Sequence, residues 1–206
     1  VYRGIKVLVL FAANGGKVTG DFWIYARYTE PYGTLPTVTR TGYTFTGWYT
    51  APTGGTQVSS STTCSQTTTH TLYAHWQGAP YTVELNQEGA ASIGTKEVTA
   101  HYEADMPTAD VTMPTAQNGY AFMGYWDKKD GQGTQYYNAE GKSAHVWDKA
   151  EDATLYAYFK AAEITIGLNA ASFEPNSATP VIATATLKPE PVGTTSICWE
   201  LLYNDD

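Results

Sequence analysis

One segment of the chain has the composition of a calcium-binding loop. Residues 127–133 read DKKDGQG, which combines two aspartates with two glycines. An EF-hand loop needs oxygen ligands at alternating positions, a distal bidentate glutamate and a flanking helix on each side. Here Lys128 and Lys129 separate the acids, and the equivalent residues 50–55 of an earlier repeat, described below, read TAPTGG. The segment is therefore predicted to be a turn, and no metal is expected to bind it.

Histidine and cysteine do not form a recognisable metal or catalytic motif. No two histidines are spaced i, i+2 or i, i+4, and Cys64 and Cys198 are too far apart for zinc or redox spacing. A disulfide is not expected, because the two cysteines fall in different predicted domains. A Ser-His-Asp site built from distant residues stays open, but no G-x-S-x-G motif is present. The histidines, which are read as exposed strand residues, are His70, His75, His101 and His145. No catalytic residue and no cofactor are predicted.

Aromatic residues are the only class plentiful enough to form a recognition surface. The chain contains 16 Tyr, 6 Trp and 6 Phe. Tyr136, Tyr137 and Trp147 fall in a long loop region, where exposed rings could stack on sugars or on a protein surface. The alternative is that these rings cover a small core that is short of aliphatic residues. The three residues are candidates for a partner surface, with a host protein or a polysaccharide as the partner.

The charge distribution excludes several classes of partner. The net charge is −8, and the acidic residues are concentrated after residue 79. Residues 1–79 carry five basic and two acidic side chains, residues 80–161 carry six and twelve, and residues 162–206 carry one and six. Without a basic cluster, the chain is not expected to bind nucleic acid, heparin or anionic membranes. No apolar run approaches the roughly 20 residues that a membrane-spanning helix needs, so membrane insertion is not expected.

An internal repeat organises the first three quarters of the chain. Residues 42–49 (GYTFTGWY) reappear as 119–126 (GYAFMGYW), displaced by 77 residues. Upstream, ARY at 26–28 matches AHY at 100–102, and downstream TLYAHW at 71–76 matches TLYAYF at 154–159. Three similar blocks in the same order indicate a tandem duplication.

Each repeat is predicted to consist of strands and turns. In the first, strands are expected at 6–12, at about 21–28, at 43–50 and across 71–76. The period of two places Tyr43, Phe45, Gly47 and Tyr49 on one face, and Leu72, Ala74 and Trp76 on one face of the closing strand. Residues 30–36 are too rich in Pro and Gly for a long helix. A unit of this size with about four strands can just support its own core, in which Phe45, Phe122, Leu72 and Leu155 are expected to be buried.

The pattern changes after residue 161. Residues 163–168, 181–187 and 196–202 are predicted to form three strands, with Trp199 in the third. A Trp in that position is typical of an immunoglobulin-type sandwich, which needs roughly 100 residues. Only residues 162–206 are left for it, so this segment is interpreted as a partial immunoglobulin-like domain.

The repeat motifs resemble a known bacterial family. The segments GYTFTGWYT at 42–50, GGT at 54–56 and TLYAHW at 71–76 look like the Listeria–Bacteroides repeat, also called the internalin B-repeat. The second unit resembles it through 133–138 (GTQYYN), 147–149 (WDK) and 154–157 (TLYA), so that the resemblance covers about residues 4–160. It implies a small β-grasp-like fold with its crossover helix reduced to an irregular segment. It also implies tandem arrays on secreted or surface-attached proteins, without an active site in the module.

The fold class is thus predicted to be mainly β, with two β-grasp-like repeats at 1–78 and 79–161 and the partial immunoglobulin-like domain at 162–206. The predicted function is that of a non-enzymatic spacer and adhesion segment on the bacterial cell surface. Its partners would be neighbouring domains of the same chain, with a host protein or polysaccharide as a further partner. Two rivals stay open: a specific binding module, and an accessory domain of a secreted enzyme.

Overall fold

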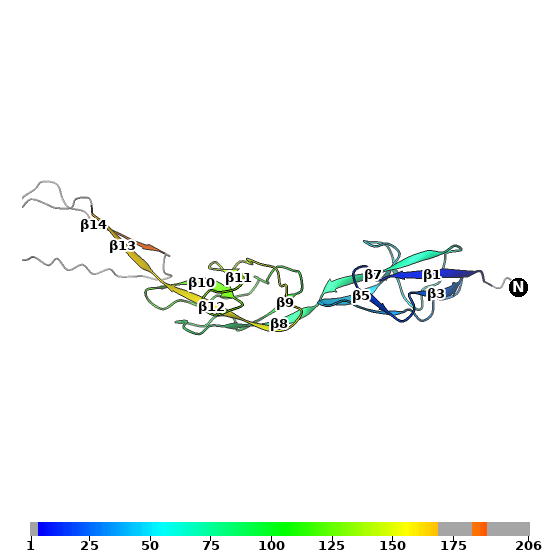
Figure 1. Cartoon of the computed structure of the whole chain (residues 1–206), viewed down its shortest axis with the longest axis horizontal. Helices are drawn as coiled ribbons and strands as arrows, with labels where there is room; N and C mark the ends of the chain where they lie inside the picture. The colour runs from blue at the N-terminus through cyan, green and yellow to red at the C-terminus, as the bar shows by residue number, and fades with distance from the viewer. Residues whose placement is uncertain (1–3, 169–182, 189–206) are drawn as a thin grey trace, which may run out of the picture. The chain divides into compact units, whose positions relative to one another are not determined.

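The computed structural model describes residues 4–168 and 183–188 (Figure 1). Every regular element in these ranges is a β-strand, as predicted. The chain forms two compact units. The first holds the described residues up to Tyr81 with His101–Ala104 and Asp148–Glu151, and the second holds the remaining described residues. Among the described residues there is no helix with the length and apolar character required to cross a membrane.

The first unit is built on a five-stranded mixed sheet. Its strands follow the order β3-β1-β7-β5-β6 across the sheet. They are β1 (Lys6–Ala12), β3 (Trp23–Arg27), β5 (Tyr43–Tyr49), β6 (Gln57–Val58) and β7 (His70–Gly78). The β1 and β7 strands are parallel, and all other neighbours are antiparallel. A separate ribbon pairs β2 (Lys17–Thr19) with β4 (Thr37–Thr39).

A second five-stranded sheet repeats this topology. Its order is β11-β10-β12-β8-β9, and β8 and β12 are parallel. The strands are β8 (Pro80–Asn86), β9 (Glu97–His101), β10 (Tyr120–Trp126), β11 (Gln135–Asn138) and β12 (Ala153–Ala161). When each strand is matched to its counterpart in chain order, the two sheets have the same arrangement. The duplication inferred from the sequence motifs is therefore also a duplication of topology.

A bulge in β5 changes which side chains face the core. The register between β5 and β7 shifts between Phe45 and Gly47, so strict alternation ends there. Trp48 is consequently the buried residue of this strand, and its ring lies 5.6 Å from that of Phe45. The prediction that Tyr43, Phe45, Gly47 and Tyr49 share one face along the whole strand is wrong for this reason. The same shift occurs in β10, between Phe122 and Gly124.

Each sheet has its own apolar core. Of the residues expected to be buried, Phe122, Leu72 and Leu155 are confirmed, whereas Phe45 is only half-buried. The parallel strand pairs place Phe11 beside Leu72 and Leu85 beside Leu155. The first core comprises Val9, Phe11, Ala26, Tyr32, Val38, Trp48, Val58, Cys64, Leu72 and Ala74. The buried apolar residues that follow in the chain are Val83, Leu85, Val98, Ala100, Met106, Ala116, Ala121, Phe122, Tyr125, Tyr136, Tyr137, Trp147 and Leu155.

Beyond the repeats, β13 (Glu163–Leu168) pairs with β14 (Ala183–Lys188) in an antiparallel ribbon. The strand predicted at 163–168 is confirmed, and the described part of the strand predicted at 181–187 falls within β14. The third predicted strand, 196–202 with Cys198 and Trp199, lies outside the described residues.

Candidate binding site

The three aromatic residues proposed as a partner surface belong to the core of the second unit. Tyr136, Tyr137 and Trp147 are all 0% exposed. The Tyr136 and Trp147 rings lie 5.2 Å apart, and the Tyr137 ring lies 6.1 Å from that of Tyr125. The structure therefore corrects the hypothesis of an exposed aromatic patch, because these rings are enclosed by the protein.

One of these rings, Trp147, stands where the first unit has the small residue Cys64. Two isolated bridges, Pro31 with Thr63 and Asp105 with Val146, are counterparts in the two units. The residue after each bridge partner can therefore be matched between the units. Trp147 corresponds to Cys64, and Met106 corresponds to Tyr32. A large ring and a smaller side chain thus exchange places between two neighbouring core positions, and the core stays filled. Comparison of the repeats at these positions is the sequence signal that identifies Trp147 as a core residue.

The acidic segment 127–133 is a turn, as predicted. The Asp127 carboxylate (Oδ1) accepts a hydrogen bond of 2.8 Å from the Thr134 backbone N–H. In the first unit the Thr50 hydroxyl (Oγ1) accepts a 2.9 Å hydrogen bond from the Thr56 backbone N–H in the same way. The carboxylate therefore has the loop-closing role that a neutral hydroxyl has in the first unit.

Each histidine lies within hydrogen-bonding distance of a backbone carbonyl oxygen. The carbonyls belong to Thr68, Ala51, Gly78 and Val146 in the order of the histidines along the chain. His70 also shares a 2.8 Å hydrogen bond with the Tyr32 hydroxyl. In the described parts of the chain, no group of three or more His, Cys, Asp or Glu side chains is arranged to hold a metal ion.

A pocket that sequence reasoning missed lies on the second unit. It has a volume of about 340 Å³ and opens where the turn after β8 approaches β12. Its walls are Glu88, Gly89, Gln117, Tyr120, Asp130, Ala157, Tyr158 and Phe159. A hollow of about 240 Å³ adjoins it and shares Glu88, Asp130 and Ala157. The pocket thus combines aromatic rings with two carboxylates, a combination suited to cationic ligands.

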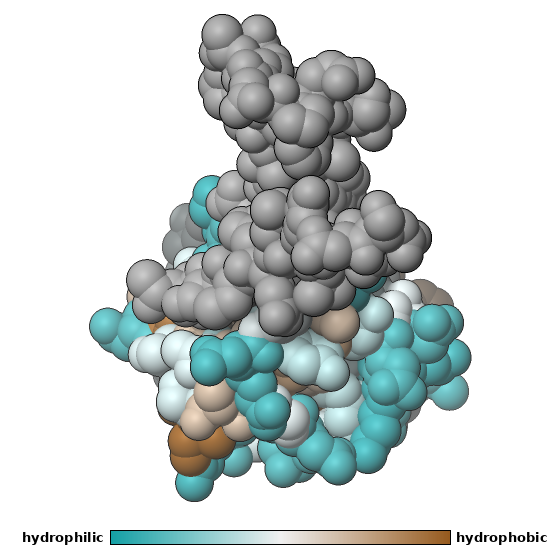
Figure 2. Space-filling model, turned by 90° about the vertical axis from the view of Figure 1, so that its left-hand side faces the viewer, coloured by the Kyte–Doolittle hydropathy of each residue, from teal (hydrophilic) through white to brown (hydrophobic). Residues whose placement is uncertain are grey.

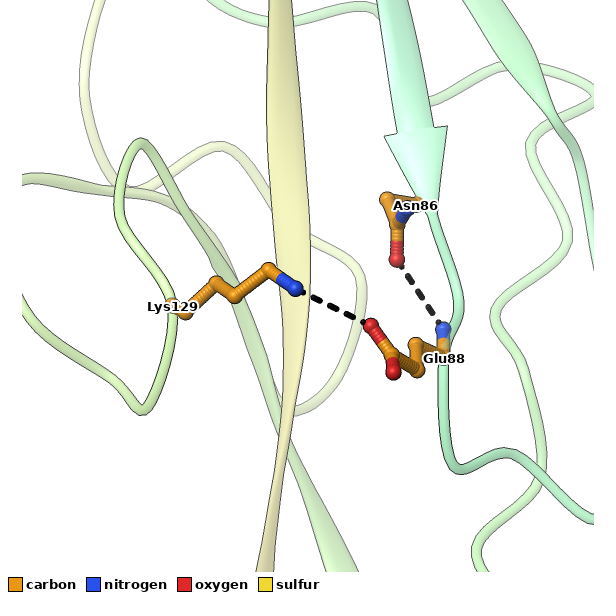
Figure 3. Close-up of polar contacts among 3 residues, drawn as sticks. All are labelled: Asn86, Glu88 and Lys129. Atoms are coloured by element: carbon orange, nitrogen blue, oxygen red, sulfur yellow. Dashed lines mark hydrogen bonds and ion pairs between the residues drawn. The ribbon is translucent and has the colours of Figure 1, made fainter.

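An ion pair joins Glu88, which lines this pocket, to Lys129, which lines the adjoining hollow (Figure 3). The Lys129 ammonium donates to Glu88 Oε2 at 3.1 Å, and Asn86 Oδ1 accepts a 3.1 Å hydrogen bond from the Glu88 backbone N–H. The hydrogen bond to Glu88 raises the pKa of Lys129, and the charge of Glu88 adds to this effect. Both side chains are well exposed, so the pair adds little stability. Glu88, the acidic member of the pair, lines both the pocket and the hollow.

A second surface feature is the edge strand β3 of the first unit. On the side of the molecule in Figure 2, hydrophilic residues cover most of the described surface and the apolar areas are small. At β3, by contrast, Trp23 and Tyr25 are 39% and 52% exposed, and the adjacent Phe22 is 60% exposed. The counterpart positions in β9 are Glu97 and Thr99. The fold therefore does not require aromatic residues there.

Comparison with known proteins gives a family match and a relative. Residues 8–75 match the Listeria-Bacteroides repeat domain, within the region whose motifs suggested that resemblance. Internalin H of Listeria monocytogenes serovar 1/2a (strain ATCC BAA-679 / EGD-e) is 39% identical over 121 residues. The alignment covers 59% of this chain and 20% of the relative. The chain therefore matches about a fifth of the length of that protein.

Proposed function

We propose that the chain is a non-enzymatic segment of a bacterial protein exposed at the cell surface or secreted, in which folded modules space and present other domains. Each module would be β-grasp-like, the first at 1–78 and the second at 79–161. An immunoglobulin-like domain would begin at residue 162. The match of residues 8–75 to the repeat domain and the similarity to internalin H support a module of a cell-surface or secreted protein.

The observation that carries the proposal is the repeated topology. Both five-stranded sheets have the same strand order and the same parallel pair between the first and last strands. Each is completed by buried side chains from its own part of the sequence. A module that buries its own core can be repeated along a chain, so that reach grows with the number of modules.

NMR relaxation of the full chain tests the spacer role. If the modules act as one rigid spacer, the amides of both units will fit a single anisotropic diffusion tensor. Modules on a flexible connection would give two independent tensors, and that result would contradict the spacer role. Amides of β1 and β7 report on the first unit, and those of β10 and β12 report on the second.

A second function, a binding module for a host protein or a glycan, is favoured by the pocket on the second unit. Accessory domains of a secreted enzyme are a weaker third candidate. Binding by the isolated chain, saturable and lost on changing pocket residues, would favour the binding module over a pure spacer.

A further inference from the structure

The first unit contains a counterpart of each residue at the core of the pocket. Gly15 and Gly89 each lie three residues after the first strand of their sheet, with φ of 93° and 88°. The Arg40 backbone carbonyl accepts a hydrogen bond from the N–H of the first residue of β5, and the Gln117 backbone carbonyl accepts one from the N–H of the first residue of β10. These first residues are Tyr43 and Tyr120. The pocket of the second unit can therefore be compared directly with the same place in the first.

In the first unit, an arginine side chain fills this place. The guanidinium carbon of Arg40 lies 3.6 Å from the centroid of the Tyr43 ring. A Cβ atom added to Gly15 would come within 3.2 Å of the same guanidinium carbon. The guanidinium therefore lies between the ring and the glycine turn, and Arg40 is half-buried.

In the second unit, the corresponding space is open. Gln117 replaces Arg40 and is exposed, and the Tyr120 ring is 44% exposed. A Cβ added to Gly89 would meet only the Phe159 ring, at 3.8 Å. The tyrosine ring that Arg40 covers in the first unit thus corresponds to Tyr120, which lines the 340 Å³ pocket in the second unit.

Two carboxylates appear where the guanidinium is absent. Asn14, which donates hydrogen bonds to the Pro52 and Ala74 carbonyls in the first unit, is replaced by Glu88. Thr53 is replaced by Asp130, which also lines the pocket. Lys129, which corresponds to Pro52, pairs with Glu88 at 3.1 Å, so one negative charge, that of Asp130, is added at the pocket without a pairing cation among the described residues. Loss of the internal guanidinium and gain of this charge both favour a cation from outside the chain.

We infer that the pocket binds the guanidinium group of an arginine side chain presented by a partner protein. The guanidinium would stack on Tyr120, as Arg40 stacks on Tyr43, and donate to the carboxylates of Asp130 and Glu88. A planar guanidinium suits this place better than a lysine ammonium, because it combines ring stacking with bidentate hydrogen bonding. The inference rests on the pocket and not on the spacer role, so either can fail alone.

The test is an NMR titration of the full chain with N-acetyl-L-arginine methylamide. The amides of Gly89 and Gln117 are expected to shift in a saturable way. The matching citrulline derivative has a planar group of the same shape without the positive charge. The lysine derivative has the positive charge without a planar group. Both are expected to bind at least about tenfold more weakly. Equal binding of either derivative would overturn the assignment of a guanidinium, as would an unchanged spectrum with the arginine derivative.

Variants locate the site. Gln117→Arg supplies the guanidinium internally, as in the first unit, and should lower affinity for the probe at least about tenfold. Asp130→Asn removes the charge and keeps a side chain that tolerates the φ of 60° at this position, so it should weaken binding while leaving the other amide signals in place. Tyr120→Ala removes the exposed ring and provides an independent variant should Gln117→Arg fail to fold. Binding that is unchanged in Asp130→Asn and Tyr120→Ala would place the probe elsewhere and refute the inference.

Discussion

Two buried tyrosines of the second unit differ by one hydrogen bond. Tyr125 and Tyr137 are both 0% exposed. The Tyr137 hydroxyl donates to the Pro107 carbonyl oxygen at 2.6 Å, whereas the Tyr125 hydroxyl has no hydrogen-bond partner among the described residues. A buried polar group without a partner costs free energy, so the two hydroxyls should contribute to stability with opposite signs.

We expect Tyr137→Phe to lower the free energy of unfolding by about 0.5–1.5 kcal/mol, because the Pro107 carbonyl loses its donor. Tyr125→Phe should leave stability unchanged or raise it by about 1 kcal/mol, because an unpaired hydroxyl is removed. Each variant is the control for the other, since both delete one oxygen from a buried ring. Urea denaturation followed by circular dichroism measures both, and equal losses would contradict the assigned hydrogen bonds.

Burial also determines how these tyrosines respond to alkali. Desolvation raises the pKa of Tyr125 and Tyr137, and in the first unit desolvation and Cys64 raise the pKa of Tyr32 to about 12. The unfolded chain, with ordinary tyrosine pKa values near 10, releases these protons earlier. Stability from the neutral rings is therefore full below pH 10 and is lost as the pH rises through the raised values. Denaturation midpoints measured from pH 8 to 12 should fall only above about pH 10, and Tyr137→Phe should flatten that fall. A decline that begins near neutral pH would contradict this.

At the scale of the element, the bulges in β5 and β10 depend on glycine. Gly47 and Gly124 adopt φ of 143° and 124°, values that side chains rarely allow. A Cβ on Gly124 would also lie 2.1 Å from the Tyr137 carbonyl oxygen. The bulge thus needs glycine both for its backbone angle and for the approach of β11.

Replacing Gly124 by alanine should therefore destabilise the second unit more than replacing Gly119. Gly119 has a φ of 80° and open space around its Cβ position, so its replacement costs only backbone strain, about 1–2 kcal/mol. Gly124→Ala adds a steric overlap worth about 1–3 kcal/mol. Thermal denaturation of the two variants measures the difference, and equal melting temperatures would show that the strands move apart freely.

The edge strand β3 provides a prediction about association. Hydrogen bonds from Phe11 to Phe22 and from Tyr28 to Ile5 fix which residues of β3 bond to β1. In an antiparallel ladder the alternate residues, here Trp23 and Tyr25, direct their backbone groups away from β1, toward the open edge of the sheet. The double variant Trp23→Glu with Tyr25→Thr copies the edge of β9 and should reduce concentration-dependent association in sedimentation velocity. A protein that is monomeric with and without the two changes would refute an associating edge.

The sequence was sufficient to predict strands at 6–12 and 43–50, because a continuous apolar run in the first and an alternating pattern in the second are each followed by a glycine-containing turn. It also predicted the repeat, through motifs that mark β3, β5 and β7. It did not predict the bulge at Gly47, because a strict period of two was assumed along the whole strand. The one extra residue of the bulge moves every later side chain of the strand to the other face. It left two readings open for Tyr136, Tyr137 and Trp147, an exposed patch or a core, because ring burial depends on partners distant in the chain, such as Tyr125 for Tyr137. The pocket was also missed. It arises from side-chain differences between equivalent positions of the two units, such as Arg40 and Gln117, and these become visible only when the two structures are compared.

At the scale of the whole molecule, two cores with separate residues should unfold separately. Val9 and Val83 are counterparts, each fully buried in the first strand of its sheet. Val9→Ala should speed hydrogen exchange at Leu72 and leave Leu155 unchanged, and Val83→Ala should do the reverse, each by about tenfold or more. The free energy changes of the double variant should add to within about 0.5 kcal/mol. Acceleration at both leucines by either change would show that the units unfold together.

The parallel pairing of the first and last strands in each sheet has a mechanical consequence. Tension applied at the N-terminal end of β1 and the C-terminal end of β7 pulls these parallel strands past each other along their length. The ladder from Val9 with His70 to Ala12 with Tyr73 is then loaded in shear, so its hydrogen bonds must yield together rather than one after another. The β8 and β12 strands, paired from Val83 with Ala153 to Asn86 with Tyr156, would respond in the same way. A chain of such modules can therefore transmit a pulling force while each sheet stays intact.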